Sequence, residues 1–438
     1  MSGKTSTLQK IKWTWQPASN REAGDSVVRN FLLHWFPSKV TKRSLSWNYS
    51  LWLGTISAVL LLILTLTGIV LMFLYVPSVE RAYLSVKDLE YTVSFGWFIR
   101  GLHRITAHLM VVVVFLHMMR VFLSGAYKNG TASNQNRPLN WIAGVVMFLA
   151  TLLLSFTGYL LPWDQLAFWA ITVGTNIASA APVAGEWVRF ILLGGTTIDQ
   201  NALIRFYVLH CFFLPMLVLL LFSYHMWRVR KDGGLACVDH LSLSQQKENV
   251  APAKSKTYSL LGITGGTTVH VQTSLVDEDK HTVNSSPNLT LRLAVVILGT
   301  LAISSILTFL FRAPLEEAAD PSVTPNPAKA PWYFLWLQEL VTDTTFTLGG
   351  YTVNGALIGG IILPGILVLA LAVWPYLDKS PVETVGVWFA KKRSKQNIVF
   401  LLVVLAVVIL TIIGTFLRGP FWEFFWPWEE WPELPKKF

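Results

Sequence analysis

The chain has 438 residues, of which 53% are hydrophobic and only 14% are charged, and its formal net charge is +10. This composition is too apolar for an ordinary soluble protein of that length. A nucleic-acid-binding domain is not indicated, because no stripe of basic residues is interleaved with aromatics. The two cysteines, Cys211 and Cys237, exclude a framework of several disulfides.

Seven stretches of the sequence are long and apolar enough to cross a bilayer as helices, for which about 20 residues suffice. Strands of an open sheet would leave backbone groups unpaired in lipid, so helices are the expected structure. The stretches are 51–76, 101–123, 141–161, 206–229, 291–310, 355–376 and 398–417. We therefore predict an all-α membrane protein with a four-helix bundle followed by a three-helix C-terminal part.

The distribution of Lys and Arg predicts the orientation in the membrane. If the N-terminus is inside, the inner segments hold 24 of the 35 Lys and Arg residues and the outer segments hold 10. Cytoplasmic loops carry the excess of positive charge. We expect a cytoplasmic N-terminus and a C-terminus on the outer side, and the same asymmetry accounts for the net charge.

The apolar pattern divides the chain into five parts. Residues 1–47 form a basic cytoplasmic segment with a short interfacial helix expected at 27–36. The first four spanning helices lie in 48–231, and the last three lie in 291–418. A polar cytoplasmic linker, 232–290, joins them and could either hold a small hairpin or be disordered. The tail, 419–438, is crowded with Trp and Phe, which is typical of a membrane-interface belt or of a docking surface for a partner subunit.

The two long outer segments, 162–205 and 312–354, have mixed apolar and small residues. We expect short helices at the membrane surface in both. Two such elements could cover a pocket that faces the outer leaflet.

Four histidines lie at two depths of the first four helices. His103 and His117 are fourteen residues apart in the second helix, which places them within roughly 40° of one face and ~21 Å apart along the axis. His210 and His225 are fifteen apart in the fourth helix, where a kink at Pro215 could absorb the extra rotation of ~60°. Both helices run inward, so each histidine of one shares a depth with a histidine of the other. This arrangement fits two b-type haems, each bound by a histidine pair.

Two other roles of histidine are alternatives to haem binding, a zinc site for the four paired histidines and an interhelical hydrogen bond for a single one. Zinc would need ligands that converge on one tetrahedral point, and depths ~20 Å apart forbid that. A single membrane histidine is usually a partner in an interhelical hydrogen bond. That is our interpretation of His108, which leaves the face of His103.

Glycines in the first and third helices repeat the histidine spacing. Small residues ordinarily allow close approach of helices, and a flat macrocycle at each depth would also need a missing side chain on each flanking helix. The glycines are Gly54 and Gly68 in the first helix and Gly144 and Gly158 in the third.

Two arginines, Arg100 and Arg120, each lie three residues outside a histidine of the second helix. They could contact haem propionates there. Extension of a long basic side chain to the membrane interface is the simpler alternative.

Four motifs resemble cytochrome b of Rieske–cytochrome b complexes of the bc and bf types. Two of them, HRITAHLMVVVVFLH and RFYVLHCFFLPM, carry the histidines, and two, GYLLPWDQLAFW and ADPSVTPNPAKAPWYF, lie in the outer segments. The fifteen-residue spacing and PWDQ are similar to the photosynthetic bf form. The motif VVILGT and the three helices of the C-terminal part resemble subunit IV of that form. The resemblance covers roughly residues 30–231 and 290–418, so two parts that are separate in the bf form would be fused here.

The resemblance implies a function. Family members oxidise quinol at an outer pocket, pass one electron to a Rieske iron–sulfur protein, and pass the other through two haems to a quinone at the inner side, with uptake and release of protons. By the same resemblance, His103 and His210 would bind the outer haem, and His117 and His225 the inner haem. The outer pocket would be lined by Tyr159, Trp332 and Tyr333, and the inner quinone site would lie near Arg230, Lys231 and Asp232.

Partners and location follow from the same resemblance. We expect a Rieske iron–sulfur protein, a cytochrome c or similar electron acceptor, a homodimeric complex, and lipids of a bacterial cell membrane around the chain. No nucleic-acid partner is expected.

The sequence departs from the family pattern in two places. The bf-type proteins attach a further haem through a cysteine at the start of the first helix, and WNYSLWLGT contains none, so no covalent haem is expected on this chain. The family quartet Pro-Glu-Trp-Tyr is here Ala330-Pro331-Trp332-Tyr333. This variant, with LQEL behind it, resembles bacterial enzymes that use menaquinol.

The missing glutamate leaves the outer proton acceptor open, since Pro331 has neither a titratable group nor a backbone N–H. Our hypothesis is that Glu339 takes over this role through water, helped by Tyr159 or Tyr333. Asp164 of the PWDQ motif is the rival. Both carboxylates could instead only bond to neighbouring backbone groups or arginines.

Two further function classes would also place histidines inside a membrane. A di-haem membrane anchor of a dehydrogenase would exchange electrons with quinone at one site only, and it would not need the outer PWDQ and PWY loops. A transporter with histidine proton relays would contain no haem, so haem absorbance of the purified protein would exclude it.

Overall fold

The computed structural model describes residues 39–130, 135–232, 234, 257–258, 269–270 and 282–432. Within this part, seven helices are long and apolar enough to cross a membrane, which confirms the all-α membrane fold. They are Leu53–Met72, Gly96–Leu123, Arg137–Leu160, Gln200–Lys231, Ser285–Leu310, Gly355–Leu377 and Lys391–Leu417. The chain forms two compact units: Met1–Trp52 with Leu235–Leu298, and Leu53–Gly234 with Gly299–Phe438.

The first unit contains short strands and helices. Strand β1 (Lys39–Thr41) pairs antiparallel with β4 (Thr282–Asn284), and the short helices η1 (Arg43–Leu45) and α4 (Trp47–Ser50) follow β1. Strand β4 leads into helix α15 (Ser285–Leu310), of which the residues up to Leu298 belong to this unit. Strands β2 (Thr257–Tyr258) and β3 (Val269–His270) form an antiparallel pair within the predicted linker, for which a small hairpin was one of two alternatives. The interfacial helix expected at 27–36 lies outside the described residues.

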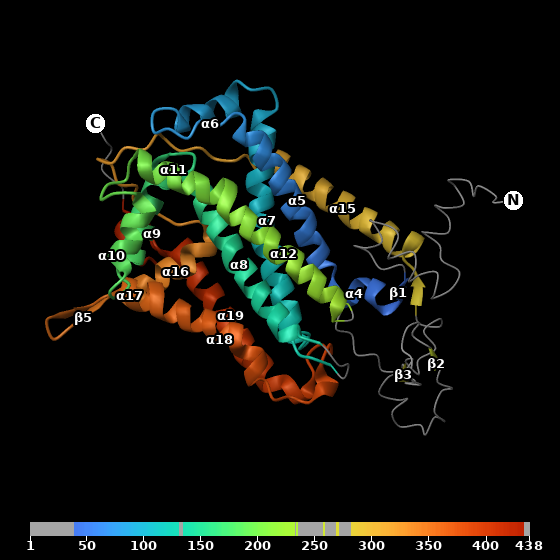
Figure 1. Cartoon of the computed structure of the whole chain (residues 1–438). Coiled ribbons are helices and arrows are strands. Elements are labelled where there is room, and N and C mark those ends of the chain that lie inside the picture. Colours follow the sequence, from blue (N-terminus) through green and yellow to red (C-terminus); the bar gives the residue numbers. More distant parts are fainter. Residues whose placement is uncertain are drawn as a thin grey trace. The chain divides into compact units, whose positions relative to one another are not determined.

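The second unit is built on a four-helix bundle. Its helices are α5 (Leu53–Met72), α7 (Gly96–Leu123), α8 (Arg137–Leu160) and the composite span of α11 (Gln200–Val208), η2 (Leu209–Phe213) and α12 (Leu214–Lys231). Figure 1 shows α5, α7, α8 and α12 running side by side, and α5 packs on α7 while α8 packs on both α7 and α12. Helix α8 begins where the side chain of Asn136 accepts from the backbone N–H of Leu139, with Pro138 in the first turn. Proline is tolerated there because the first N–H groups of a helix have no internal partner.

The fourth span contains a π-helical turn, η2, that includes His210 and ends two residues before Pro215. A π-turn accommodates one residue more than an α-turn, so it absorbs the extra residue in the fifteen-residue spacing. The predicted kink at Pro215 was therefore incomplete as an explanation. Pro215 has no N–H to donate to a carbonyl of the preceding turn. The backbone of Leu209–Phe213 adopts the wider π-turn at this interruption.

The outer segments contain the expected short helices. Segment 162–205 forms α9 (Gln165–Ser179) and α10 (Gly185–Leu193), and segment 312–354 forms α16 (Trp332–Asp343). A β-hairpin follows α16, in which β5 (Phe346–Leu348) and β6 (Tyr351–Val353) are joined by Gly349 and Gly350 at positive φ angles of 56° and 88°. Helix α6 (Ala82–Tyr91), between the first two spans, was not predicted.

The C-terminal part adds two further composite spans to this unit. One is α17 (Gly355–Leu357), η3 (Ile358–Ile362) and α18 (Leu363–Leu377); the other is η5 (Lys391–Arg393), α19 (Ser394–Ile412) and η6 (Ile413–Leu417). The short helices η4 (Val382–Thr384) and η7 (Pro420–Trp422) lie in the segments beside them. Helix α18 packs on α8, and α19 packs on α16.

A buried ion pair ties this C-terminal part to the end of α7. The side chains of Arg393 and Asp378 are fully buried, with the Arg393 Nε donating to Asp378 Oδ2 at 3.2 Å. The Tyr127 hydroxyl donates to the same oxygen at 2.7 Å, and Arg393 also donates to the backbone carbonyl of Phe122 at 2.9 Å. Burial alone would raise the pKa of Asp378, but hydrogen bonds from Tyr127 and Ser380 hold it at about 2. The carboxylate is therefore a charged structural anchor.

Candidate functional site

The four predicted histidines meet in two pairs. The ring centroids of His103 and His210 are 6.2 Å apart with planes at 76° to each other, and those of His117 and His225 are 6.5 Å apart at 78°. Two metal–imidazole bonds of about 2 Å each, plus half of each ring, span a similar distance. Each pair can therefore bind one metal ion between its two rings.

Each of the four predicted glycines faces one of these rings. A Cβ atom added to Gly54 would lie 3.2 Å from His117 Cε1, and one added to Gly68 would lie 3.3 Å from His103 Cε1. On the other side of the bundle, a Cβ on Gly144 would lie 3.9 Å from His225 Cε1, and one on Gly158 would collide with the ring of His210. The absence of a side chain thus leaves space beside both histidine pairs.

Two threonines that sequence reasoning missed contact the outer histidine pair. Thr67 Oγ1 lies 2.9 Å from His103 Nδ1, and Thr157 Oγ1 lies 3.2 Å from His210 Nδ1. The carbonyl oxygen of Leu154 lies 3.1 Å from the same nitrogen of His210. Each threonine directly precedes a ring-facing glycine, so the repeated Thr-Gly dipeptide was the signal available in the sequence.

The donor set fits haem better than a metal bound by protein alone. Among the residues that the structure describes, no group of three or more His, Cys, Asp or Glu side chains could hold a metal ion. Two imidazoles leave the other coordination positions of an iron to a macrocycle, and the glycines provide room beside it. An Nδ1 that is engaged elsewhere also leaves Nε2 free to coordinate.

A second cluster lies where α16 begins. Tyr333, Tyr159 of α8 and Asp164 are all within electrostatic reach of Arg104 on α7. Pro331 precedes the helix, and Trp332 and Tyr333 form its first turn. The structure thus brings together the predicted pocket residues and adds Arg104, which sequence reasoning left without a role because it lies inside an apolar helix.

Burial changes the proton affinity of two groups in this cluster. It raises the pKa of Tyr333 to about 12 and also raises the pKa of Asp164. Asp164 is only 8% exposed, and its oxygens accept the backbone N–H groups of Ala167 at 2.9 Å and Glu316 at 3.3 Å. It is the N-cap of α9. These two bonds oppose the effect of burial but leave further lone pairs on the carboxylate.

The PWDQ motif also joins the two outer segments. The Gln165 backbone N–H donates to Glu317 O at 2.9 Å, and its side chain exchanges hydrogen bonds with the backbone of Asp320 at 2.7 and 3.1 Å. Trp169 Nε1 donates to Val323 O at 2.9 Å. The motif therefore holds the segment before α16 against α9.

Comparison with known proteins decides the family. The model of cytochrome b/b6/petB matches residues 37–233, and that of cytochrome b(C-terminal)/b6/petD matches residues 318–425. The chain belongs to the cytochrome b family. It is a redox subunit of a quinol-oxidoreductase complex, and the family implies b-type haems.

Curated relatives and a solved structure agree with this assignment. Cytochrome b6 of Prochlorococcus marinus strain NATL1A is 42% identical over 181 residues, which is 41% of this chain and 80% of the relative. Cytochrome b6 of Synechococcus sp. strain RCC307 is 41% identical with the same coverage. A structure titled "Hyperthermophilic respiratory Complex III" has the same fold, with a TM-score of 0.67 and 23% identity over 92% of this chain and 91% of that chain. The predicted family and the fusion of its two parts are confirmed.

The structure does not place Glu339 as we expected for a proton acceptor of this cytochrome b. The carboxylate is 1% exposed and accepts from Arg418 Nε at 3.0 Å to each oxygen and from Arg418 Nη2 at 2.5 Å. Arg418 directly follows the last span and also reaches Asp343 at 3.5 Å. Because both oxygens are held by one guanidinium, Glu339 is a structural partner of Arg418, which was the simpler alternative.

The two predicted propionate ligands differ in their surroundings. Arg100 is buried, and its terminal nitrogens donate to Glu90 at 2.8 Å, to Ala313 O at 2.9 Å and to Pro314 O at 2.5 Å. These contacts hold the guanidinium against the start of the outer segment, so we withdraw it as a propionate ligand. Arg120 is 3% exposed and lies within electrostatic reach of His117. Its contact with a propionate stays a prediction.

The predicted inner quinone residues are divided between buried and exposed positions. Asp232 is 2% exposed, accepts from Arg228 at 2.5 Å and from the Asn136 backbone N–H at 3.0 Å, and so fixes the end of α12. Lys231 is exposed and lies 4.7 Å from the ring centre of Trp227, and Arg230 is also exposed. Of the three, only these two basic side chains are available to a ligand at the inner face.

His108 is explained by a hydrogen bond between helices. Trp332 Nε1 of α16 donates to His108 Nδ1 of α7 at 3.2 Å, and the ring of Tyr333 lies 5.9 Å away. The expected hydrogen bond between His108 and another helix is therefore present.

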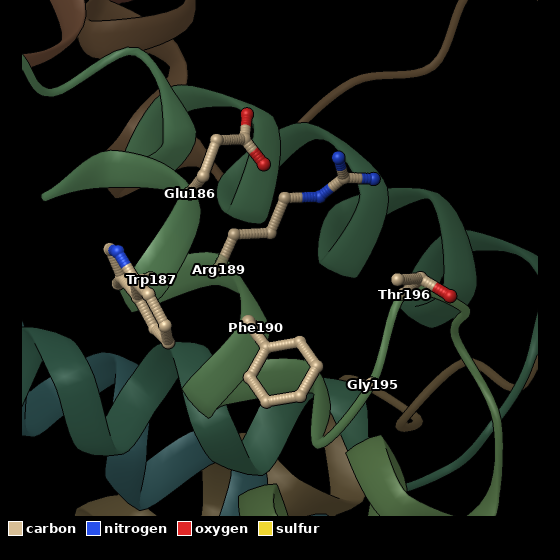
Figure 2. Close-up of a pocket in the computed structure, with 6 residues that line it drawn as sticks. All are labelled: Glu186, Trp187, Arg189, Phe190, Gly195 and Thr196. Atoms are coloured by element: carbon tan, nitrogen blue, oxygen red, sulfur yellow. The ribbon is translucent and has the colours of Figure 1, made fainter. Parts of the chain in front are cut away.

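A cavity of about 410 Å³ lies elsewhere, on α10 and the loop after it. Figure 2 shows its lining, which contains none of the predicted site residues: Glu186, Trp187, Arg189, Phe190, Gly195 and Thr196. The exposed aromatic side chains there suit contact with lipid at the membrane boundary.

Proposed function

We propose that this cytochrome b oxidises quinol at an outer-side site and passes electrons through two b-type haems to a quinone site at the inner side. The observation that carries the proposal is the pair of histidine sites, each flanked by ring-facing glycines of two further helices. A di-haem anchor would also have two such sites, but it would not need the outer segments that carry PWDQ and Trp332-Tyr333. Two sites at different depths of one bundle provide a route across the membrane.

The histidines would hold the haems by their Nε2 atoms, His103 and His210 at the outer site and His117 and His225 at the inner site. When bound, the haems supply reversible one-electron chemistry that no side chain of the bundle has. The protein contributes the spacing of the sites, the clearance at the glycines and the exclusion of water by apolar helices.

At the outer site, the residues of the second cluster would bind quinol and receive its protons. Trp332, Tyr333 and Tyr159 offer flat apolar surfaces with polar tips, which suit a quinone ring. Asp164 is the acceptor that we propose in place of Glu339. Its raised pKa makes its carboxylate a better base than an exposed one, and Arg104 nearby limits the rise. A base of this kind must lie within hydrogen-bond reach of the quinol hydroxyl or one water away.

The wider assignment rests on the sequence motifs. We propose menaquinol as the substrate because of the Ala330-Pro331-Trp332-Tyr333 variant. A Rieske iron–sulfur protein and a cytochrome c or similar acceptor would complete a homodimeric complex. The domain order would be a haem-binding part, 48–231, and a subunit IV-like part, 291–418, in a bacterial cell membrane with the N-terminus cytoplasmic.

The test of the outer site is Asp164→Asn in the purified complex. Asparagine still caps a helix, so α9 should keep its start, but the side chain can no longer accept a proton. Since a positioned base contributes about 10²–10⁴-fold, we expect quinol oxidation to slow at least tenfold with both haem spectra intact. Stopped-flow reduction of the haems by a menaquinol analogue measures this rate.

Glu316→Gln is the matched control, because Glu316 contacts Asp164 through its backbone only. That variant should turn over normally. Near-normal turnover of the Asp164→Asn variant would show that the acceptor is another group or water. Failure of quinol to reduce either haem in the unmodified complex would contradict the proposed function itself.

A further prediction concerns covalent haem. Cys211 is a free cysteine of the fourth span, and no cysteine occurs near the start of the first span. Haem-stained denaturing gels should therefore show no band at the mass of this chain, 49.1 kDa. A stained band there would refute the assignment of purely non-covalent haems.

A further inference from the structure

The two histidine pairs differ in the hydrogen bonds of their Nδ1 atoms. At the outer pair, both Nδ1 atoms contact a threonine hydroxyl, and His210 also contacts a backbone carbonyl. At the inner pair, the His117 Nδ1 is buried and has no hydrogen-bond partner among the described residues. The His225 ring contacts the backbone of Asn140, as His210 contacts that of Leu154, but the His225 Nδ1 has no hydroxyl partner among the described residues.

The direction of the outer hydrogen bonds follows from the threonines' other contacts. Thr67 Oγ1 donates to the carbonyl of Ile63 at 2.7 Å, and Thr157 Oγ1 donates to the carbonyl of Leu153 at 2.9 Å. A hydroxyl has one proton, so each threonine oxygen must accept from the histidine. Both outer imidazoles therefore carry their proton on Nδ1.

The fourteen-residue repeat in the sequence shows the same difference in hydrogen bonding between the two pairs. Thr67 and Thr157 precede the glycines that face the outer rings, while Leu53 and Ala143 occupy the same positions before the glycines that face the inner rings. Neither Leu53 nor Ala143 has a hydroxyl group. The inner pair thus also faces two glycines, but it lacks the threonine hydroxyls.

A hydrogen bond from the far nitrogen of a ligating imidazole makes the ring a stronger base. A more basic ligand stabilises oxidised iron more than reduced iron, and hydrogen bonding around a haem is one of the ways in which a protein sets its reduction potential. We propose that Thr67 and Thr157 are tuning residues that hold the outer haem at a lower reduction potential than the inner haem. This inference rests on the proposed function, in which these histidine pairs bind the haems.

The consequence is a direction for electron transfer. An electron that enters at the outer haem would move to the inner haem with a favourable change in free energy. The direction of electron transfer would then depend in part on the hydroxyl groups of Thr67 and Thr157. Moving these hydroxyls to the positions of Leu53 and Ala143 should reduce or reverse the difference between the two potentials.

The experiment is a redox titration of haem absorbance in the purified complex with Thr67→Val and Thr157→Val. Valine has nearly the shape of threonine and removes the hydrogen bond. We expect the lower of the two midpoint potentials to rise, by about a tenfold change in the reduction equilibrium or ~59 mV for one electron, while the higher midpoint stays unchanged. A lower midpoint that does not move, or an equal shift of both, would overturn the proposal.

The chain offers matched controls for both variants. Thr65 in α5 and Thr151 in α8 donate only to backbone carbonyls, those of Leu61 at 2.8 Å and Met147 at 2.9 Å. Thr65→Val and Thr151→Val should leave both potentials unchanged. A shift equal to that of the test variants would show that any loss of a helix hydroxyl produces it, and would reject the proposal.

A gain of the hydrogen bond provides an independent second test. Ala143→Thr places a hydroxyl at the inner counterpart of Thr157, and we expect it to lower the higher midpoint while leaving the other in place. An unchanged higher midpoint, with haem bound, would count against the proposal. Failure of the proposed function is seen separately, because His103→Leu would then retain its full haem content.

Discussion

Replacement of His117 by leucine will remove one of the two b-type haems and leave the other in place. The two ring pairs are separate sites, with centroid separations of 6.2 Å at the outer pair and 6.5 Å at the inner pair. Leucine cannot coordinate iron, and His225 would then be the only histidine left to hold a haem at this site. Quantitative haem extraction should give half of the normal haem per chain, and the reduced-minus-oxidised spectrum should keep only the outer component.

His108→Leu is the control for this variant. His108 lies on the same helix but bonds to Trp332 of α16, so its replacement should leave two haems per chain. Full occupancy of both haems in the His117→Leu variant would refute the ligand assignment. If that variant fails to assemble, Gly54→Val tests the same site, since a side chain there would press on the ring of His117, and normal inner haem content would then contradict the arrangement.

The spanning helices and the histidine pairs could be predicted because their signals are local and periodic. A bilayer requires an apolar run of a certain length, and ligands on one face of a helix repeat at its pitch. His103, His117 and the four glycines follow that rule. The spacing of His210 and His225 broke it by one residue, and the structure shows that a π-turn restores the alignment.

Contacts between distant parts of the chain were not predictable in this way. Glu339 and Arg418 are 79 residues apart, and nothing in either local pattern indicates the other. Viewed alone, Glu339 was an acid close to the Trp332-Tyr333 motif, and a role in proton transfer followed from that proximity. In the structure the Glu339 carboxylate is paired with Arg418. Burial of an unpaired carboxylate would have cost folding free energy.

Thr67 and Thr157 were missed for a different reason. Threonine in an apolar helix commonly bonds to its own backbone, and both residues do so here. Their second contact, with a histidine of another helix, depends on how two helices are rotated against each other. Arg104 was overlooked similarly, because its neighbours Tyr159, Tyr333 and Asp164 come from other elements.

The pair of Glu339 and Arg418 joins α16, which carries Trp332 and Tyr333, to the residue after the last span. The side chains are 1% and 14% exposed, so the charges are largely removed from water. Removal of one partner from such a pair leaves the other charge buried and costs about 3–5 kcal/mol, whereas replacement of both by apolar residues is often tolerated. Loss of either Glu339 or Arg418 alone should therefore destabilise the packing of α16, whereas replacement of both by apolar residues should not.

We accordingly expect Glu339→Gln and Arg418→Gln each to lower the thermal midpoint of the complex, followed by haem absorbance, and the double variant Glu339→Leu with Arg418→Leu to recover most of that loss. The exposed pair of Glu383 and Lys392 is the control, because surface ion pairs contribute little, and Glu383→Gln should change nothing measurable.

Turnover separates this structural role from proton transfer. A structural pair predicts that the Leu/Leu variant, which has no carboxylate at position 339, oxidises quinol at a near-normal rate while folded. If that variant is stable but slowed at least tenfold, Glu339 is the proton acceptor after all, because the geometry is then retained and only the titratable group is missing.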